Sequence, residues 1–292
     1  MKTISLLPIV LALAVVRASA QLSVEVVTDQ DQFLAGEPLP VAVKITNRSG
    51  RPLHLGTEAD WLTFNVESFD GFVVSKKSEV PVTGEFELES SQMGTKRVDL
   101  APSFLLGKPG RYKITATLRV KDWSAQTASA PKSFDVISGA KLWAQDFGVP
   151  ATNGTPEMRK YTLEQASYLH AQMRLYVQVS DVTESRIIQT RALGPSVSFS
   201  HPEAQVDRLS LLHVLWQTGA QSFNYCVVDA DGKLVRREIF DDLSTRPRLT
   251  VNESGDVQVI GGVKRAKLGE ILEVKPPVET PASNPVAAPA AK

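Results

Sequence analysis

Side chains able to carry out chemistry are sparse in this sequence and lie far apart. Two histidines that share a metal ion commonly stand in H-x-H or H-x-x-x-H spacing. None of the four histidines has a partner at either spacing: His54, His170, His201 and His213. The one cysteine, Cys226, stands in the apolar run 223–228, a setting that favours a buried strand residue over a reactive thiol. We therefore expect neither a metal site nor a cysteine nucleophile.

Motifs of known catalytic chemistry are missing as well. The sequence contains no G-x-S-x-G turn, no S-x-x-K and no glycine-rich phosphate loop. The stretch Asp229-Ala230-Asp231-Gly232 starts like a calcium loop but lacks the later acidic ligands, so it predicts a tight turn. The expectation is a protein that is not an enzyme and has no catalytic residue and no cofactor.

Basic residues gather near the end of the chain and form a candidate binding set, beside the loops at one end of a sandwich. Together they could contact an acidic glycan or a carboxylate ligand. The alternative, which the sequence favours, is that they are solvated charges on strand edges, where they discourage edge-to-edge pairing. The set comprises Arg236, Arg237, Arg246, Arg248, Lys264 and Arg265.

The first twenty residues have the layout of a secretory signal peptide. Lys2 supplies a positive start, residues 4–16 are almost continuously apolar, and Ala18-Ser19-Ala20 is a small-residue exit. Cleavage is expected between Ala20 and Gln21. The apolar run is shorter than the roughly 20 residues of a membrane-spanning helix. We expect an exported protein, periplasmic or extracellular, without an integral membrane segment after cleavage.

Charge and cysteine usage agree with that compartment. The chain has 32 basic and 32 acidic residues, and cleavage would remove only Lys2 and Arg17, so acidic groups would exceed basic ones by two. This balance does not favour nucleic acid or an anionic membrane surface as partner. One cysteine excludes an intramolecular disulfide, so hydrophobic cores must hold the protein, which suits a bacterial envelope protein.

Alternation of apolar and polar residues predicts an all-β fold. In residues 112–120, Tyr112, Ile114 and Ala116 alternate with Lys113 and Thr115, which places apolar groups on one face of a strand. Turn residues separate further short runs of this kind. They predict an antiparallel sandwich over residues 21–138. The expected strands are 24–27, 41–45, 62–66, 72–74, 86–88, 112–120 and 134–137.

Two motifs in this half resemble bacterial immunoglobulin-like and macroglobulin-type β-sandwich domains. One is the turn Phe33-Leu34-Ala35-Gly36-Glu37-Pro38-Leu39, which leads into the alternating run 41–47. The other is Pro109-Gly110-Arg111-Tyr112-Lys113-Ile114 before a late strand. The resemblance implies that Tyr112 sits at a corner and hydrogen-bonds to nearby backbone. It implies a scaffold rather than an activity.

The remainder of the chain predicts an ordered connector, a second β domain and a tail. Glycine and proline interrupt residues 139–157, the expected connector. Residues 158–265 are the expected second domain, starting with a short helix at 162–169, because Thr162 and Gln165 have capping-box spacing. Residues 266–292, rich in proline and alanine, predict a disordered tail.

Hairpin patterns in the second domain bear a weak resemblance to β-propeller blades. Residues 211–228 followed by Asp231-Gly232 suggest one blade, and residues 248–259 the start of another. About 108 residues are too few for a closed ring of at least about four blades. The other expected strands are 174–179, 186–190, 196–200 and 234–240.

Three functions remain open on the sequence alone. The leading one is an exported, non-enzymatic binding or structural protein whose partner is a protein or glycan of the envelope. The alternative is a secreted protease inhibitor of the sandwich type, with its reactive loop at 75–84 or 90–96. The third is a glycan-processing enzyme, for which no pair of catalytic carboxylates is recognisable.

Overall fold

The computed structural model describes residues 21–72, 74–123, 125–149, 157–169 and 172–266. These residues form an all-β protein of several antiparallel sheets, and no α-helix occurs among them. The expected signal peptide and the expected tail from residue 267 onward lie outside the described residues. Within the described ranges, no helix has the length and apolar character needed to cross a membrane.

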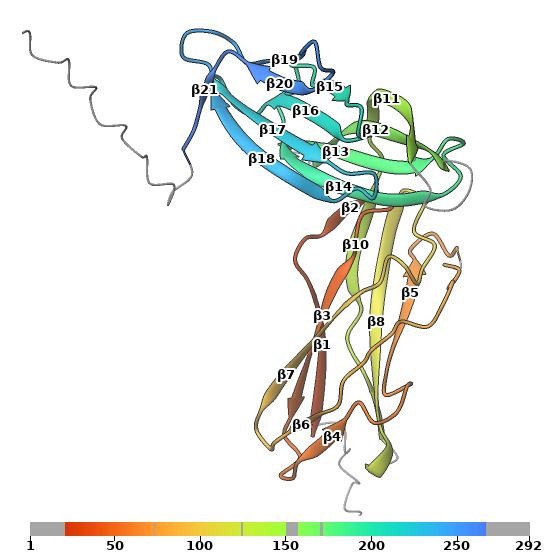
Figure 1. Ribbon diagram of the computed structural model, residues 1–292. Helices are drawn as coiled ribbons and strands as arrows, with labels where there is room; N and C mark the ends of the chain where they lie inside the picture. Colours follow the sequence, from red (N-terminus) through yellow and green to blue (C-terminus); the bar gives the residue numbers. More distant parts are fainter. Residues whose placement is uncertain (1–20, 73, 124, 150–156, 170–171, 267–292) are drawn as a thin grey trace, which may run out of the picture.

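The N-terminal part, residues 22–137, is a β-sandwich (Figure 1). A three-stranded sheet has the order β1 (Leu22–Thr28), β3 (Pro40–Asn47) and β7 (Met93–Asp99). A second sheet has the order β2 (Gln32–Leu34), β10 (Lys132–Ile137), β8 (Gly110–Val120) and β5 (Leu62–Ser68), and β9 (Ala125–Ala128) also pairs with β8. A small sheet joins β4 (Leu53–Leu55) to β6 (Phe86–Leu88).

Alternation along β8 shows how the sequence builds this sandwich. Tyr112, Ile114, Ala116 and Leu118 are buried in one hydrophobic core, and the residues between them face outward. A strand has a side-chain period of two, so one face packs on the core and the other is exposed to solvent. The alternation predicted from the sequence is confirmed.

Tyr112 makes the backbone hydrogen bond that the resemblance implies for a corner tyrosine. Its hydroxyl donates a hydrogen bond of 2.6 Å to the carbonyl oxygen of Lys108, four residues earlier. Its ring stacks on Phe134 of the neighbouring strand β10, with ring centres 5.5 Å apart. The side chain therefore ties the loop before β8 to the sheet.

The C-terminal part, residues 140–265, is built from two larger sheets and a hairpin (Figure 1). The first sheet has the order β11 (Ala140–Val149), β12 (Glu157–Tyr168), β13 (Gln172–Asp181) and β14 (Ile187–Pro195). The second has the order β15 (Glu203–Val206), β16 (Leu212–Gln217), β17 (Ser222–Val228), β18 (Leu234–Asp241) and β21 (Val263–Lys264). Strands β19 (Arg248–Val251) and β20 (Val257–Ile260) form the hairpin.

Hydrophobic residues fill both faces of the second sheet. Leu212, Val214 and Cys226 belong to a core shared with the first sheet. Leu215 and Tyr225 belong to a smaller core that the hairpin covers with Leu249 and Val259. Consecutive antiparallel strands account for the blade-like hairpins expected from the sequence, but the described residues pack as stacked sheets.

One expectation for the junction region is wrong. Residues 162–169, expected as a helix, belong to strand β12 up to Tyr168. Tyr161 and Leu163 pack in the core on one face of this strand, and Ala166 packs toward the N-terminal part on the other. Burial on both faces hides the alternation that identifies a strand. The expected connector contains strand β11, which pairs with β12 along residues 140–149.

Candidate functional site

The turn that resembles immunoglobulin-like domains joins the two parts of the molecule. In strand β14, the amide nitrogen of Thr190 donates to the Gly36 carbonyl oxygen at 3.2 Å, and its hydroxyl donates to the Ala35 oxygen at 3.0 Å. Leu34 packs in a small buried cluster with Ala166 and Tyr176. Backbone bonds and apolar packing therefore fix this turn to the C-terminal part.

Glu37 is a half-buried carboxylate of this junction. One of its oxygens accepts a hydrogen bond from the amide nitrogen of Leu34 at 2.9 Å, and the other accepts from the Gln30 side chain at 3.4 Å. Burial raises the pKa of Glu37, and these hydrogen bonds together with the charge of Arg174 oppose the rise. Arg174 itself lies over the ring of Tyr168 at 3.4 Å.

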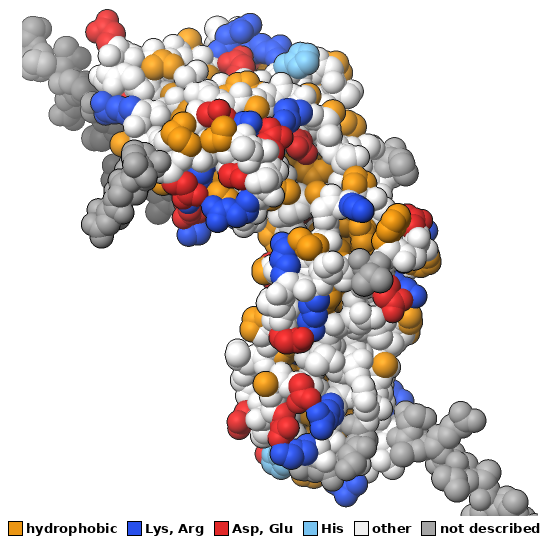
Figure 2. Space-filling model, turned by 90° about the vertical axis from the view of Figure 1, so that its right-hand side faces the viewer, with side chains coloured by type: hydrophobic (Ala, Val, Ile, Leu, Met, Phe, Trp, Pro, Cys, Tyr) orange, Lys and Arg blue, Asp and Glu red, His pale blue; other side chains and the backbone are white. Residues whose placement is uncertain are grey.

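A groove of about 560 Å³ opens beside this turn, between the two parts. Its floor is the turn 33–39 with Phe134 and Val136 of β10, one wall is the loop 99–107, and the other is residues 184–189. Such a volume is within the range of about 300–1,000 Å³ that is usual for ligand sites. Figure 2 shows hydrophobic side chains on the surface where the molecule narrows between its two parts.

Both walls of the groove carry apolar side chains, and charged side chains lie among them. Leu105 is 53% exposed, and Leu106, Ile187 and Ile188 are half-buried. Both signs of charge occur along the groove, where the charged lining residues are Glu37, Lys77, Asp99, Glu184 and Arg186. Glu184 pairs with Lys141 and Lys160, and Arg186 pairs with Glu157. The groove is therefore suited to apolar groups.

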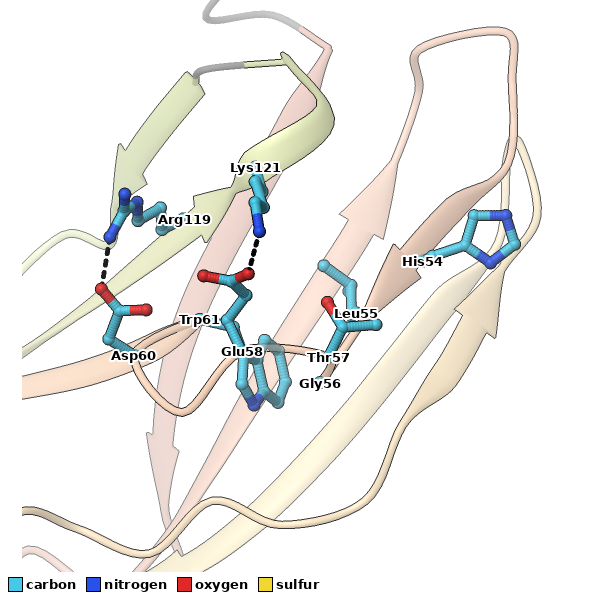
Figure 3. Close-up of a pocket in the computed structure, with 9 residues that line it drawn as sticks. All are labelled: His54, Leu55, Gly56, Thr57, Glu58, Asp60, Trp61, Arg119 and Lys121. Atoms are coloured by element: carbon cyan, nitrogen blue, oxygen red, sulfur yellow. Dashed lines mark hydrogen bonds and ion pairs between the residues drawn. The ribbon is translucent and has the colours of Figure 1, made fainter.

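A smaller hollow of about 80 Å³ lies near β4, in the half of the sandwich away from the C-terminal part (Figures 1 and 3). Figure 3 shows two ion pairs side by side, Arg119 with Asp60 and Lys121 with Glu58. The indole of Trp61 is buried and donates to the Val82 carbonyl oxygen at 3.3 Å. The hollow has room for only a few waters, whose liquid volume is about 30 Å³ each. It is not the leading candidate site.

The predicted basic residues are bonded within the fold. Arg236 and Lys264 both pair with Glu238, and Arg265 pairs with Asp241. Arg248 lies 3.7 Å from Glu203. Two further members contact neutral groups: Arg237 donates to the Leu193 carbonyl oxygen, and Arg246 lies over the ring of Phe223. Neighbouring acids therefore balance the charges of Arg236, Arg248, Lys264 and Arg265. Binding of a ligand through the basic set stays a prediction.

Two hydrogen bonds from arginine side chains link the two larger sheets of the C-terminal part. Arg237 on β18 reaches the Leu193 backbone on β14, and Arg191 on β14 reaches the Gly232 carbonyl oxygen at 2.8 Å. Both strands are near the open edges of their sheets, where charged side chains hinder pairing with other chains. For Arg237 this agrees with the edge role that the sequence favours.

A buried polar chain that sequence reasoning missed joins strands β16 and β17 to the turn after β15. Nδ1 of His213 lies 2.7 Å from the Tyr225 hydroxyl, and its Nε2 lies 3.1 Å from a carboxylate oxygen of Asp207. The other oxygen of Asp207 accepts from the amides of Leu209 and Leu211. Burial raises the pKa of Tyr225 to about 12. With both ring nitrogens in contact and 7% exposure, His213 acts as a structural link.

Other predicted features take the structural roles expected of them. Cys226 is fully buried, and burial raises the pKa of its thiol to about 12, so it is not a ready nucleophile. Asp229 accepts hydrogen bonds from the amides of Asp231 and Lys233, which confirms the tight turn. No group of three or more potential metal ligands occurs among the residues that the structure describes.

The two segments proposed as inhibitory loops are tied to the sandwich. In segment 75–84, Val80 and Val82 are buried and Lys76 forms a bridge with Phe104. In segment 90–96, residues from Met93 onward belong to strand β7, which pairs with β3. Neither segment is a freely projecting loop along its whole length.

No protein family model matches the chain, and no curated protein sequence matches it. Among solved structures, the sporulation control protein Spo0M from Bacillus subtilis is similar at 9% sequence identity. The similarity covers 84% of this chain and 91% of that chain, with a TM-score of 0.29. A likeness of this size supports no inference about function.

Proposed function

We propose that the chain is an exported, non-enzymatic binding protein whose ligand site is the groove between its two β parts. The observation that carries the proposal is the apolar lining of a groove of about 560 Å³. Exposed apolar surface of this kind is retained where a partner covers it. The walls come from loops held on rigid sheets, a common arrangement for binding sites.

The N-terminal part is proposed to be an immunoglobulin-like domain. Support comes from its two packed sheets and from the bond between the Tyr112 hydroxyl and the Lys108 carbonyl oxygen. In this proposal the domain positions the turn 33–39 and the loop 99–107, and the C-terminal part supplies residues 184–189. The binding site then exists only where both parts meet.

The groove is tested with the dye 1-anilinonaphthalene-8-sulfonate, whose fluorescence rises on apolar protein surfaces. We expect saturable binding to the mature protein that falls about tenfold in Leu105→Glu, because a charge in the wall costs more than 1.4 kcal/mol. Leu209→Glu changes an exposed leucine outside the groove and is the matched control. Equal dye binding by the two variants would reject the groove as the ligand site.

Export is tested on the protein recovered from outside the cytoplasm. Intact mass should correspond to a chain that begins at Gln21, because Ala18-Ser19-Ala20 forms the expected cleavage exit. Recovery of the chain with residues 1–20 still attached would contradict this part of the proposal.

A further inference from the structure

We propose that the mature chain has a modified N-terminus, in which the side chain of Gln21 closes on its own α-nitrogen to form pyroglutamate. The proposal rests on export with cleavage between Ala20 and Gln21, which is part of the proposed function. It adds a modification site at the start of strand β1, and it is independent of the groove.

Glutamine is the residue type that this chemistry requires. Cleavage after Ala20 turns the backbone nitrogen of Gln21 into a free α-amine. The nitrogen, Cα, Cβ, Cγ and Cδ of one glutamine close a five-membered ring with little angle strain. Asparagine would have to close a strained four-membered ring, and the carboxylate of glutamate is a poor electrophile. Among these residue types, glutamine therefore combines a reactive amide with a favourable ring size.

The reaction needs no oxidant, reductant or second substrate. The lone pair of the neutral α-nitrogen attacks Cδ, so the N–Cδ bond forms and the Cδ–Nε2 bond breaks. One proton passes from the α-nitrogen to Nε2, which leaves as ammonia, and one hydrogen stays on the lactam nitrogen. A fraction of α-amines is neutral at pH 7, because the usual pKa of this group is about 7.7–8.0.

The structure leaves the side chain of Gln21 available for this reaction. Gln21 is exposed, and its side chain has no hydrogen bond to any residue that the structure describes. Two later glutamines differ, because Gln30 bonds to Glu37 and Gln32 accepts from the Leu169 amide. The side chain of Gln21 can therefore fold back on its own nitrogen without breaking a contact.

The fold also accommodates the ring. The carbonyl oxygen of Gln21 accepts a hydrogen bond of 2.7 Å from the amide nitrogen of Arg48. The ring does not include this carbonyl group, so the bond is kept after closure. Pairing of β1 with β3 begins one residue later, where Leu22 lies opposite Asn47. Cyclisation therefore leaves the first sheet intact.

Cyclisation changes the charge and the protection of the terminus. A lactam nitrogen is not protonated at neutral pH, so the positive charge of the terminus is removed. Chain termini are frequent sites of proteolysis, and an ordinary aminopeptidase requires a free α-amine. The ring would therefore protect the exposed start of β1 outside the cytoplasm.

The test compares the wild type with Gln21→Asn, both recovered from outside the cytoplasm. The variant keeps a side-chain amide and lacks one methylene group, so it is the matched control. The intact mass of the wild type should be one ammonia below that of an unmodified chain beginning at Gln21, whereas the variant should have its full mass. Terminal sequencing should read the variant and fail on the wild type. Pyroglutamyl aminopeptidase should restore a wild-type sequence that begins at Leu22.

The outcomes separate this proposal from export. A wild-type chain that begins at Gln21 with full mass would overturn cyclisation and leave export standing. A chain that still carries residues 1–20 would overturn both. Urea unfolding checks the fold, and Gln21→Asn should keep the wild-type midpoint, because the bond to the Arg48 amide uses the backbone. A lower midpoint would also count against the proposal, because it would mean that the fold holds this side chain.

Discussion

Gly36 and Ile187 lie in contact across the junction although 150 positions separate them in the chain. A methyl group added to Gly36 would come within 2.6 Å of Cγ2 of Ile187. The backbone of Gly36 also has a φ of 78°, which side chains disfavour. A residue expected to serve a local turn thus lets the two parts approach each other beside the groove.

The first prediction concerns this contact. Gly36→Ala should lower the free energy of unfolding by the strain of a positive φ, about 1–2 kcal/mol, and by a further 1–3 kcal/mol or so for overpacking. Gly71→Ala is the matched control, because its φ is 77° and no atom would lie within 4 Å of the added group. Urea unfolding measures both, and equal losses would mean that the junction yields without cost.

The second prediction concerns the half-buried carboxylate of Glu37. Because burial raises its pKa above the usual 4.5, its contribution to stability is present below pH 4.5 and is lost as pH rises through the raised value. Glu37→Gln removes the partly desolvated charge, and its side-chain oxygen can still accept the hydrogen bond from the Leu34 amide. It should therefore match or exceed wild-type stability at neutral pH and flatten this pH dependence.

Thermal unfolding measured from about pH 4 to about pH 8 tests this effect, because the range begins below the usual glutamate pKa of 4.5 and ends above neutrality. Glu37→Ala should be less stable than Glu37→Gln, because it leaves the Leu34 amide without its acceptor. Glu25→Gln, on an exposed face of β1, is the control. A fall in stability of Glu37→Gln at neutral pH would show that the hydrogen bonds of the carboxylate and the charge of Arg174 outweigh desolvation.

The third prediction concerns the corner tyrosine. Tyr112→Phe removes the bond to the Lys108 carbonyl oxygen and keeps the ring stacked on Phe134. The free energy of unfolding should fall by about 1 kcal/mol, the usual net value of such a bond. No change in the denaturant midpoint would mean that water replaces the tyrosine hydroxyl as donor to the Lys108 carbonyl oxygen without loss of stability.

The fourth prediction concerns the chain from Asp207 through His213 to Tyr225. Tyr225→Phe leaves Nδ1 of His213 without its partner in a buried setting and should cost about 1–3 kcal/mol. His213→Phe removes both of its contacts, and the double variant should cost less than the sum of the single ones. A double-mutant cycle measures the coupling, expected at about 0.5–3 kcal/mol, and additive losses would contradict the link.

The fifth prediction concerns the basic residues near the end of the chain. Arg246→Glu with Arg248→Glu should reduce retention on heparin, an acidic glycan, at low salt. Retention of the wild type should already be weak, because neighbouring acids balance much of this charge. Unchanged retention in the double variant would discard these residues as a binding surface.

Local sequence predicts the strands with one solvent-exposed face well. Strand β8 shows this, because Tyr112 and Ile114 alternate with exposed or half-buried residues and the alternation is visible in the sequence. Alternation does not reveal strand β12, because Tyr161, Thr162 and Leu163 are all buried and give no period of two. The sequence does predict the tight turn at Asp229, since its hydrogen bonds join near neighbours in the chain.

Residue patterns are thus enough to predict the all-β class, the faces of the half-exposed strands and the local turns, and the resemblance to immunoglobulin-like domains implies the corner at Tyr112. The stacking of the sheets, the contact of Gly36 with Ile187 and the groove beside them become visible only once the chain is folded. The difference lies in the distance along the chain over which each interaction acts. Side-chain alternation and turn geometry depend on residues a few positions apart, whereas a groove forms where surfaces distant in the chain pack together and leave space between them.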